Sequence, residues 1–393
     1  MGDTHQPART TERGTPRPGS YLEMNMRWIA LLATCAAALT LAPAQHEAGI
    51  HGPAGFKGYV DSGPQRGLLF WDNGRQEMVI QPGWTIATAT LTGDEYNDEG
   101  LLKNFDSLGM VIPLPSLPDK YAAVEPDLFD DIDKFTEVVS RVPEPEGGSE
   151  TNDGPDITDG SSGDELEMYE VVDVGEYTIQ PIKGNGEAGG KELNAWFKKN
   201  GFGEFDERVL RWYNQNGYYW LAVSAEAKGG LPANGTLKPL HVSFKTPRPC
   251  YPFKVYDKRG AFNLELYVIT RHAIDLTKSR RFGIDAPEQI TDSRQQNNRE
   301  VSFVKLPEAV RTIANGSEEL KDLRLSKVFV YRFIGRNIEN EDLGIDLATL
   351  QEELHFEFEK DVAKKPETEV KPAEPKEDNP EEGDKDKPEE EGR

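Results

Sequence analysis

Residues 68–80, LLFWDNGRQEMVI, decide the fold class of this chain. Two apolar runs, 68–71 and 78–80, flank Asn73-Gly74. An Asn-Gly pair supplies the positive φ values that a type I′ turn requires, so these residues predict a β-hairpin. This hairpin is the strongest local structural signal in the sequence, and it predicts a β-rich fold around it.

Strand-like and helix-like segments follow the hairpin in irregular order. Pro126 opens a predicted helix with Leu128, Ile132, Phe135 and Val139 on one face. Regular alternation of strands and helices, which would indicate a parallel α/β sheet, is missing. We therefore predict an α+β fold with β-rich mixed or antiparallel sheets and a few interspersed helices. The other predicted strands are 84–91, 110–114, 169–174, 177–183, 218–225, 239–245, 263–271, 327–334 and 355–358, and the other predicted helices are 191–200, 205–216, 307–315 and 347–353.

Two segments have the composition of unfolded chain. Residues 143–168 are rich in acidic residues, Gly and Ser and have no basic residue, and residues 360–393 repeat Pro, Glu, Lys and Asp without an aromatic residue. Such compositions bury too little apolar surface to offset the entropy of ordering. We predict an acidic disordered loop or linker and a disordered acidic tail. They set off an N-terminal β-rich half at 45–142, an α+β half of the same domain at 169–275 and a C-terminal α/β extension at 276–359.

Residues 24–44 have the pattern of a signal peptide. Arg27 supplies a positive charge, residues 28–41 are apolar, and Ala42-Pro43-Ala44 is the small-x-small site that signal peptidase cuts. The apolar run is too short and too rich in alanine for a membrane span. We therefore expect an exported protein, periplasmic, in the cell envelope or secreted, that starts near Gln45 and has no membrane span after cleavage.

The leader has two further features. Residues 1–23 are long for the start of a signal peptide, so we expect an upstream extension and translation from Met24 or Met26. Cys35 follows Leu-Ala-Thr, as in lipoprotein leaders, but Thr34 is a poor residue before such a cysteine, and the apolar run continues past it. A lipid anchor is therefore the less favoured alternative.

The charge and the cysteine content limit the partners and the compartment. The formal net charge is −24 and the pI is about 4.8. Both oppose nucleic acid or an anionic lipid surface as a partner, because basic residues would have to outnumber the local acids. Once the leader is removed, Cys250 is the one cysteine left. The mature protein then has no intramolecular disulfide and depends on its core for stability.

Residues 184–189, GNGEAG, match the dinucleotide-binding pattern G-x-G-x-x-G, and Glu204 lies where a ribose-binding acid is expected. The preceding strand, however, contains Pro181 and Lys183 where a buried parallel strand should be apolar. Glu204 also follows the predicted helix directly instead of ending a second strand. We therefore interpret these residues as a flexible glycine-rich connector and predict no cofactor.

His46 and His51 resemble a zinc motif that is one residue too long. In H-E-x-x-H the two histidines share one helix face, whereas a spacing of five residues turns the second histidine away. Gly49, Gly52 and Pro53 also oppose a helix. A frayed mature N-terminus is the favoured interpretation, and a loose divalent-metal site is the alternative.

Cys250, with His241 and His272 in nearby segments, suggests a Cys-His nucleophile. Pro249 and Pro252 favour an extended edge instead of the helix N-terminus that lowers the pKa of a thiol. We therefore predict a buried apolar cysteine. Residues 302–305, SFVK, match S-x-x-K in a β-like run without the partner motifs of the serine enzymes that carry it, and we interpret them as a chance match.

Aromatic residues are dense between residues 196 and 220. Such rings could stack on sugar faces or bind a protein partner, but their helical and alternating spacing favours core packing. The acidic runs 130–133 and 153–165 lack the glycine and the final glutamate of a calcium loop and predict a solvated face and a solvated linker. The aromatic residues are Trp196, Phe197, Phe202, Phe205, Trp212, Tyr213, Tyr218, Tyr219 and Trp220.

A set of short segments occurs in an order that resembles a known family. The segments are GLLFWDNG at 67–74, MVIQ at 78–81, MVIPLPSLP at 110–118, LF at 128–129, LNAWFKKNG at 193–201, YWLAV at 219–223, PRPCYP at 247–252 and YRFIGR at 331–336. Together they resemble a bacterial exported family known as domain of unknown function 2330. The resemblance implies export and one architecture spanning the acidic loop, and it supplies no site residue. Family members often have several cysteines at the mature N-terminus, and this chain has none there.

Taken together, the sequence predicts no catalytic, cofactor-binding or metal-binding residue. We expect a non-enzymatic binding or structural component of the cell envelope or periplasm, with a protein or glycan partner and no nucleic acid. The alternative is an extracytoplasmic hydrolase with scattered catalytic residues, with or without a metal bound through His46 and His51.

Overall fold

The computed structural model describes residues 50–53, 56, 58–87, 91, 93, 102–138, 140–141, 166–227, 229–253, 255, 262–276, 288–291, 300–338 and 354–359. The chain divides into one compact unit that ends at Glu359 and a second unit formed by residues 360–393. The predicted signal peptide at 24–44, the acidic run 153–165, the helix 347–353 and the tail 360–393 lie outside the described residues.

The predicted hairpin is formed by β3 (Gln65–Asp72) and β4 (Arg75–Gln81). Its turn has positive φ at Asn73 and Gly74, as a type I′ turn requires. Around it lies a nine-stranded sheet, the large sheet, whose order is β7-β14-β4-β3-β16-β19-β17-β8, with β18 also on β19. The other strands are β7 (Lys120–Ala123), β8 (Ser140–Arg141), β14 (Leu240–Lys245), β16 (Phe262–Thr270), β17 (Glu288–Thr291), β18 (Val301–Ser302) and β19 (Lys327–Ile338).

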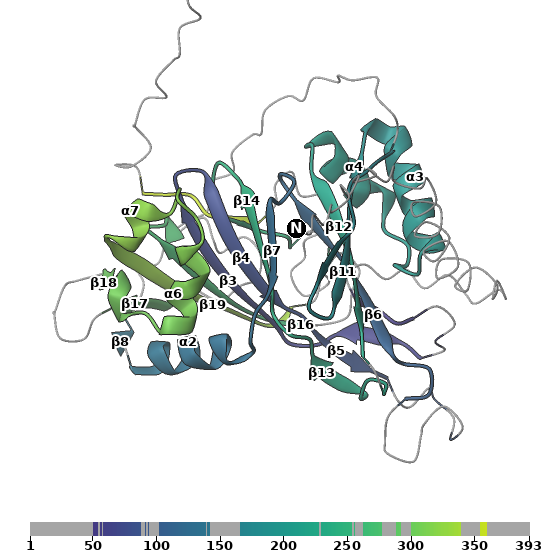
Figure 1. Cartoon of the computed structure of the whole chain (residues 1–393), viewed down its shortest axis with the longest axis horizontal. Helices are drawn as coiled ribbons and strands as arrows, with labels where there is room; N and C mark the ends of the chain where they lie inside the picture. The colour runs from purple at the N-terminus through teal and green to yellow at the C-terminus, as the bar shows by residue number, and fades with distance from the viewer. Residues whose placement is uncertain are drawn as a thin grey trace, which may run out of the picture. The chain divides into compact units, whose positions relative to one another are not determined.

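One pair of strands in the large sheet is parallel. β16 runs parallel to β3 and antiparallel to β19, so the sheet is mixed. Strands from the start, the middle and the end of the described chain thus lie side by side at its centre (Figure 1). The predicted α+β fold with mixed and antiparallel sheets is confirmed.

A second sheet has six strands, all paired antiparallel, in the order β1-β6-β12-β11-β10, with β9 also on β11. Two small sheets complete the strand structure, β13-β5-β2 and β15-β20. The strands of the second sheet are β1 (Ile50–His51), β6 (Ser107–Leu114), β9 (Leu166–Met168), β10 (Val172–Val174), β11 (Tyr177–Gly184) and β12 (Tyr219–Glu226). Those of the small sheets are β2 (Val60–Ser62), β5 (Gly83–Ile86), β13 (Asn234–Thr236), β15 (Cys250–Tyr251) and β20 (Leu354–His355).

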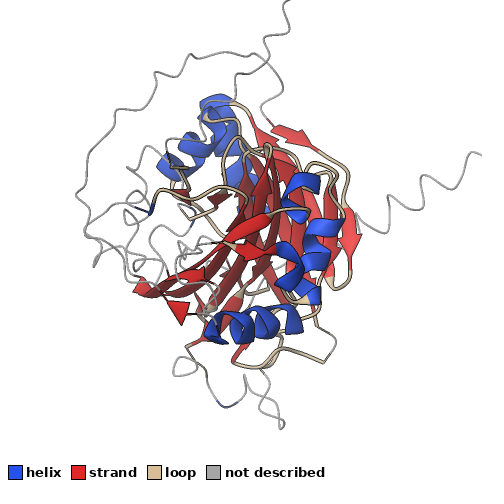
Figure 2. Ribbon diagram, turned by 90° about the vertical axis from the view of Figure 1, so that its left-hand side faces the viewer, coloured by secondary structure: helices blue, strands red, loops and turns tan. Residues whose placement is uncertain are grey.

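The helices lie outside the strands in two groups (Figures 1 and 2). α3 (Gly186–Lys199) and α4 (Glu207–Gln215) lie beside the second sheet. The other group lies on the large sheet and consists of α2 (Asp127–Val138), η6 (Phe303–Lys305), α6 (Glu308–Asn315) and α7 (Lys321–Arg324). Within the described residues, none of the helices is both long enough and apolar enough to span a bilayer.

Two hydrophobic clusters fill the spaces between these layers. One joins residues of the large sheet and of the second sheet with α3 and α4, and it includes Leu69. The other joins the large sheet to α2, η6, α6 and α7, and it includes Leu68 and Phe70. Successive residues of β3 therefore face different cores, and burial on both faces explains the continuous apolar run at 68–71.

α3 begins earlier than its periodicity predicts. Its first residue is Gly186, five residues before the predicted start at Lys191. Gly189 and Gly190 are buried, and a Cβ on Gly190 would contact the Asn214 amide on α4. Close helix packing thus overrides the low helix propensity of glycine. The predicted flexible connector is wrong, because the glycines form a short turn and the first turn of a helix.

Candidate functional site

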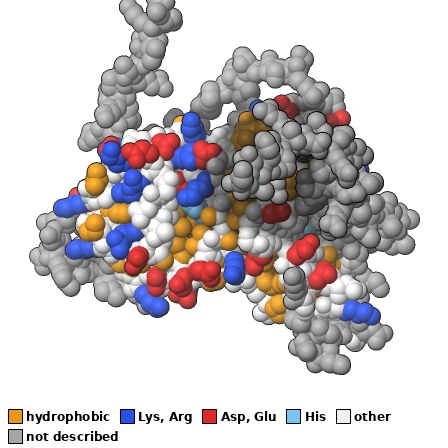
Figure 3. All heavy atoms as spheres, in the orientation of Figure 1, with side chains coloured by type: hydrophobic (Ala, Val, Ile, Leu, Met, Phe, Trp, Pro, Cys, Tyr) orange, Lys and Arg blue, Asp and Glu red, His pale blue; other side chains and the backbone are white. Residues whose placement is uncertain are grey.

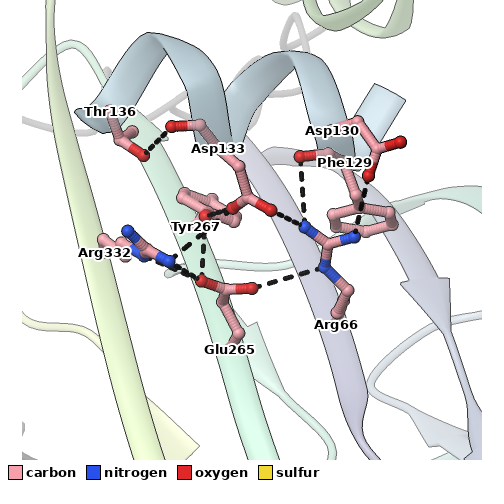
Figure 4. A network of polar contacts seen from close by, with 8 residues as sticks. All are labelled: Arg66, Phe129, Asp130, Asp133, Thr136, Glu265, Tyr267 and Arg332. Atoms are coloured by element: carbon pink, nitrogen blue, oxygen red, sulfur yellow. Dashed lines mark hydrogen bonds and ion pairs between the residues drawn. The ribbon is translucent and has the colours of Figure 1, made fainter. Parts of the chain in front are cut away.

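The face of the large sheet under α2 carries a set of charged side chains, the arginine–carboxylate network (Figure 4). Arg66 on β3, Glu265 and Tyr267 on β16, and Arg332 on β19 point from three adjacent strands toward Asp133 on α2. On their strands these residues lie an even number of positions from Leu68, Ile269 and Val330, so they share the sheet face that packs against the helices.

Ion pairs and hydrogen bonds connect the members of this network. Arg66 Nε lies 3.3 Å from Glu265 Oε2, and Arg66 also bonds the Asp133 carboxylate. Arg332 Nε donates to Glu265 Oε1 at 2.7 Å. The Tyr267 hydroxyl bonds Asp133 and lies 3.0 Å from Glu265 Oε1. Burial, and then the hydrogen bond to Asp133, raises the pKa of Tyr267 above its ordinary range.

This arrangement supports the position of a helix. Two arginines face two carboxylates, and their opposite charges compensate one another, although Arg66 Nε is buried without a hydrogen bond. The Arg66 guanidinium also stacks on Phe129 of α2, with its carbon 4.9 Å from the ring centre, and donates to the Phe129 carbonyl at 3.2 Å. The network therefore fixes α2 on the sheet, and it presents one exposed carboxylate, Asp130, at 3.6 Å from Arg66.

A second polar cluster lies on the same face, on β4 and β14. His241 Nε2 lies 2.7 Å from Glu77 Oε2, and Ser243 Oγ donates to Glu77 Oε1 at 2.6 Å. All three side chains are buried. The serine bonds the glutamate instead of the histidine, so the geometry of an activated serine nucleophile is not present here. Next to it, Arg75 donates to Asp119 Oδ2 at 2.6 Å, and this bond lowers the pKa of Asp119.

The dense aromatic residues form a small core between α3, α4 and the second sheet. Phe197, Tyr213 and Trp220 are completely buried, and their rings contact one another edge to face. Trp196 stacks on Phe202 with the ring centres 5.9 Å apart and is partly buried. These rings therefore stabilise the fold, as their spacing predicts.

One of these aromatic residues, Tyr219, is instead partly exposed and lies beside Tyr169, which is also partly exposed, at the edge of the second sheet. Tyr169 and Tyr219 have ring centres 5.7 Å apart, and Lys183 Nζ lies 5.0 Å from the centre of the Tyr219 ring. The Tyr169 hydroxyl donates to Glu167 Oε2 at 2.9 Å, and Asn185 Nδ2 donates to Glu167 Oε1 at 2.9 Å. We call these five residues the tyrosine surface.

The tyrosine surface is held in place by the backbone. Tyr169 N donates to the Pro181 carbonyl at 3.0 Å, and Gln180 Nε2 donates to the Tyr169 carbonyl at 2.7 Å. Two exposed apolar side chains, Met168 and Val171, flank Tyr169 in sequence. Partly exposed rings beside charged and amide groups can stack on a ligand and hydrogen-bond its edge. This combination is the best candidate binding site among the described residues.

Cys250 is buried in β15 and held by Gln76, whose amide donates to the Cys250 carbonyl at 2.8 Å and accepts from its N–H at 2.9 Å. Gln76 and His241 lie on opposite faces of the large sheet. Gln76 is two residues from Met78 and shares its face, whereas His241 pairs with Val79, which faces the other hydrophobic cluster. The structure therefore does not bring Cys250 and His241 together.

The residue opposite Cys250 is His355 on β20, which the sequence analysis missed. His355 Nε2 lies 3.2 Å from Glu357 Oε1. His272 follows β16, and its ring centre lies 6.1 Å from that of Phe358. Because β20 is far from Cys250 in sequence, no local signal indicated this pairing.

His51 is not in a frayed terminus. Ile50 and His51 form β1, which pairs with β6, and the His51 ring lies edge to face with Phe205 at 6.1 Å. His51 is buried, and His46 lies outside the described residues. No group of three or more metal-binding side chains occurs within the described residues.

The remaining motifs are distributed through structural elements. Gly184 ends the antiparallel strand β11 and Gly186 begins α3, so the parallel βαβ unit of a dinucleotide site is not formed. Ser302 lies in β18, and residues 303–305 form η6 instead of a strand. Of the acidic run 130–133, Asp133 is the network carboxylate described above, so that part of the run is not simply a solvated face.

Comparison with known proteins gives one family. Residues 100–335 match the model of DUF2330, described as an uncharacterized protein conserved in bacteria. No curated protein matches the chain.

Among solved structures, the chain has a low likeness to baculovirus proteins. A mutated baculovirus P35 after caspase cleavage is 12% identical over 60% of this chain and 73% of that chain, with a TM-score of 0.29. A caspase-8/P35 complex is 9% identical over 70% and 91% of the two chains, with a TM-score of 0.29. A likeness at this level does not extend to function.

Proposed function

We propose that this chain, which belongs to the DUF2330 family of uncharacterized proteins conserved in bacteria, is an exported, non-enzymatic binding component of the bacterial cell envelope. Export is supported by the sequence of residues 24–44, with Arg27, the apolar run and the Ala42-Pro43-Ala44 site. Binding is supported by one observation, the tyrosine surface at the edge of the second sheet.

The chemistry of the tyrosine surface favours an envelope glycan as the ligand. Sugar rings offer apolar C–H faces that stack on Tyr169 and Tyr219, and hydroxyl groups that bond Glu167, Lys183 or Asn185. The side chains are already fixed by the bonds of Glu167 with Tyr169 and Asn185, so little ordering is required on binding. A protein ligand is the alternative.

Binding is tested by sedimentation with purified peptidoglycan and by capture on soluble envelope glycans. We expect the double variant Tyr169→Ala/Tyr219→Ala to lose at least about tenfold in affinity, since each stacked ring contributes about 1 kcal/mol or more. Val304→Ser, which changes an exposed side chain of η6 outside the tyrosine surface, is the surface control and should bind normally. Failure of the unchanged protein to bind either glycans or proteins of an envelope extract would remove the proposal.

Export is tested separately by N-terminal sequencing of protein recovered from the bacterial envelope. We expect the first residue to lie near Gln45. Recovery of chains that keep residues before Gln45 would contradict cleavage at Ala44.

The hydrolase alternative is favoured by the pairing of Cys250 with His355, whose ring in turn contacts Glu357. A histidine beside a cysteine can act as its base when a carboxylate orients it. A hydrolase panel, repeated with Cys250→Ala and His355→Ala, and metal analysis by mass spectrometry test this alternative. Absence of turnover and of bound metal would remove it, whereas turnover lost in both variants would replace the binding proposal.

A further inference from the structure

Lys183 is the member of the tyrosine surface whose charged group stays open to a ligand. Among the described residues its ammonium forms no hydrogen bond and no ion pair, and it lies 5.0 Å from the centre of the Tyr219 ring. An ammonium group has three N–H donors and no acceptor, and a ring face attracts the charge without accepting a full hydrogen bond. The half-buried Lys183 therefore has donors available for an acceptor on a bound molecule.

Glu167, which lies directly opposite Lys183 in the pair of β9 with β11, does not take these donors. Its Oε1 accepts a hydrogen bond from Asn185 Nδ2 at 2.9 Å, and its Oε2 accepts one from the Tyr169 hydroxyl at 2.9 Å. These bonds, that of Asn185 first, lower the pKa of Glu167, so the carboxylate stays ionised at neutral pH. Glu167 thus positions Tyr169 and Asn185 and leaves the ammonium of Lys183 to the ligand.

The ammonium lies where a ligand on the two tyrosines would reach it. β11 carries Lys183 and pairs with both β9 and β12, and β12 carries Tyr219. Tyr169 follows β9, and its ring centre lies 5.7 Å from that of Tyr219, while Lys183 Nζ lies over the Tyr219 ring. A sugar ring that packs on the tyrosines therefore brings the groups attached to its carbon atoms close to this ammonium.

The rest of the molecule does not attract anions in general. The formal net charge of the chain is −24. Figure 3 shows acidic side chains at the lower edge of the view, where Figure 1 places α2 with Asp127 and Asp130 in its first turn. A diffuse negative potential repels anions, so an anionic ligand is held only through short-range contact with a fixed positive charge. On the tyrosine surface that charge is Lys183.

We propose that Lys183 makes the tyrosine surface selective for glycans that carry carboxylate groups, the chemistry of uronic acids. A hydrogen bond between an ammonium and a carboxylate is charge-assisted and stronger than one to a neutral sugar hydroxyl. A carboxylate brings one negative charge to the one ammonium, whereas a phosphate monoester would bring nearly two beside Glu167. The inference rests on the proposed function and names the class of glycan that the same site binds.

The test compares two ligands that differ in the carboxylate alone. Binding of the purified full chain is measured by titration calorimetry with a short oligogalacturonide and with the same oligosaccharide after its carboxylates are reduced to primary alcohols. We expect the oligogalacturonide to bind about fivefold or more tightly, because a charge-assisted hydrogen bond contributes more than a neutral one. The difference should shrink as added salt screens the lysine.

Lys183→Met should abolish this preference, because methionine keeps an apolar side chain beside Tyr219 and removes the charge. Its affinity for the reduced oligosaccharide should stay unchanged, which also shows that the variant keeps the folded site. Lys183→Arg should retain the preference, since a guanidinium also donates to a carboxylate. Lys103→Met, at an exposed lysine outside the tyrosine surface, is the matched control and should leave both affinities unchanged.

Equal affinities of the unchanged protein for the two oligosaccharides, or binding of neither, would overturn the inference. A preference that survives in Lys183→Met would overturn it as well, and so would an equal loss of both ligands in that variant, since the lysine would then only support the fold of the site. Neutral glycans bound through Tyr169 and Tyr219 without preference would contradict this inference alone. The proposed function fails separately, when the unchanged protein binds neither envelope glycans nor envelope proteins.

Discussion

On the helix-covered face of the large sheet, polar and charged side chains form closely hydrogen-bonded groups. Glu77 is hydrogen-bonded to His241 and Ser243, and Asp119 accepts a hydrogen bond from Arg75. A buried charge is costly unless it is paired and hydrogen-bonded, so each group depends on its partners being present. The consequences at single residues can be measured one substitution at a time.

Asp119→Asn should reduce the loss in free energy of unfolding that the protein shows as the pH falls into the acid range. The Arg75 hydrogen bond lowers the folded-state pKa of Asp119 below its ordinary 3.8. Its contribution is therefore complete above the unfolded-state pKa and is lost as pH falls through the lower folded-state pKa. The carboxylate is 57% exposed, so solvent screening limits the effect to about 1 kcal/mol or less.

Urea unfolding measured between neutral pH and pH 2.5 tests this expectation. The unchanged protein should lose more stability below pH 4 than Asp119→Asn does. Asp106→Asn, at an exposed carboxylate without an ion pair in the described part of the chain, is the control. Parallel pH profiles for the unchanged protein and Asp119→Asn would contradict the assignment.

Ser243→Ala should lower the free energy of unfolding by about 1–3 kcal/mol, because it leaves a buried carboxylate oxygen without its donor. The Ser243 hydroxyl donates to Glu77 Oε1 at 2.6 Å, and both side chains are buried. Ser107→Ala removes a half-buried serine with a long, solvent-exposed 3.4 Å contact to Asp106 and should change stability by less than about 0.5 kcal/mol. Equal losses in chemical denaturation would show that the buried bond adds nothing.

Among the elements, the local sequence predicts best those that have a clear turn signal or one apolar helix face. The β3–β4 hairpin, α2 and α6 form close to the predicted residues, since an Asn-Gly turn or one apolar helix face determines them. β7, with its half-buried KYAA sequence, has no such pattern and was missed. α3 starts earlier than predicted, and its Gly190 lies against Asn214 of α4, a contact that periodicity does not contain.

Asp133→Asn should loosen α2 from the sheet. Asp133 is the carboxylate through which Arg66, Tyr267 and Arg332 hold this helix. We expect a loss of about 1–3 kcal/mol, because charge-assisted bonds in a partly buried site are removed. Hydrogen exchange should accelerate in α2 more than in α4.

Asp130→Asn is the matched control on the same helix. Asp130 lies 3.6 Å from Arg66 but is 67% exposed, so its loss should cost less than about 1 kcal/mol. If both variants left the exchange of α2 unchanged, the network would not be what holds the helix.

At the scale of the whole molecule, the large sheet depends on contacts between distant segments. The parallel pairing of β3 with β16 joins residues near 65–71 to residues near 264–270. Such long-range pairings determine the strand order, and they bring β20 and its His355 beside Cys250. A single sequence does not specify pairings between strands that no local turn connects. The tyrosine surface was missed for the same reason, since Tyr169 and Tyr219 meet through β11.

The last described segment supports the sheet from its other face. Phe356 is buried, its ring centre lies 4.9 Å from that of Phe333 on β19, and its N–H donates to the Pro249 carbonyl at 2.9 Å. Glu357 and Glu359 accept and donate bonds with residues 273–275, so the segment lies between two distant parts of the chain. Its contacts therefore join β19 to the segments around residue 249 and residues 273–275.

Phe356→Ala should lower the free energy of unfolding by about 3–5 kcal/mol, since a buried ring is replaced by a cavity. Leu325→Ala removes a side chain that is 79% exposed and should change stability by less than about 0.5 kcal/mol. Because residues to Glu359 form one compact unit, the loss should appear in near-UV circular dichroism and in tryptophan fluorescence at the same denaturant concentration. A separate early transition for Phe356→Ala would instead show that this segment unfolds on its own and adds little to the sheet beneath it.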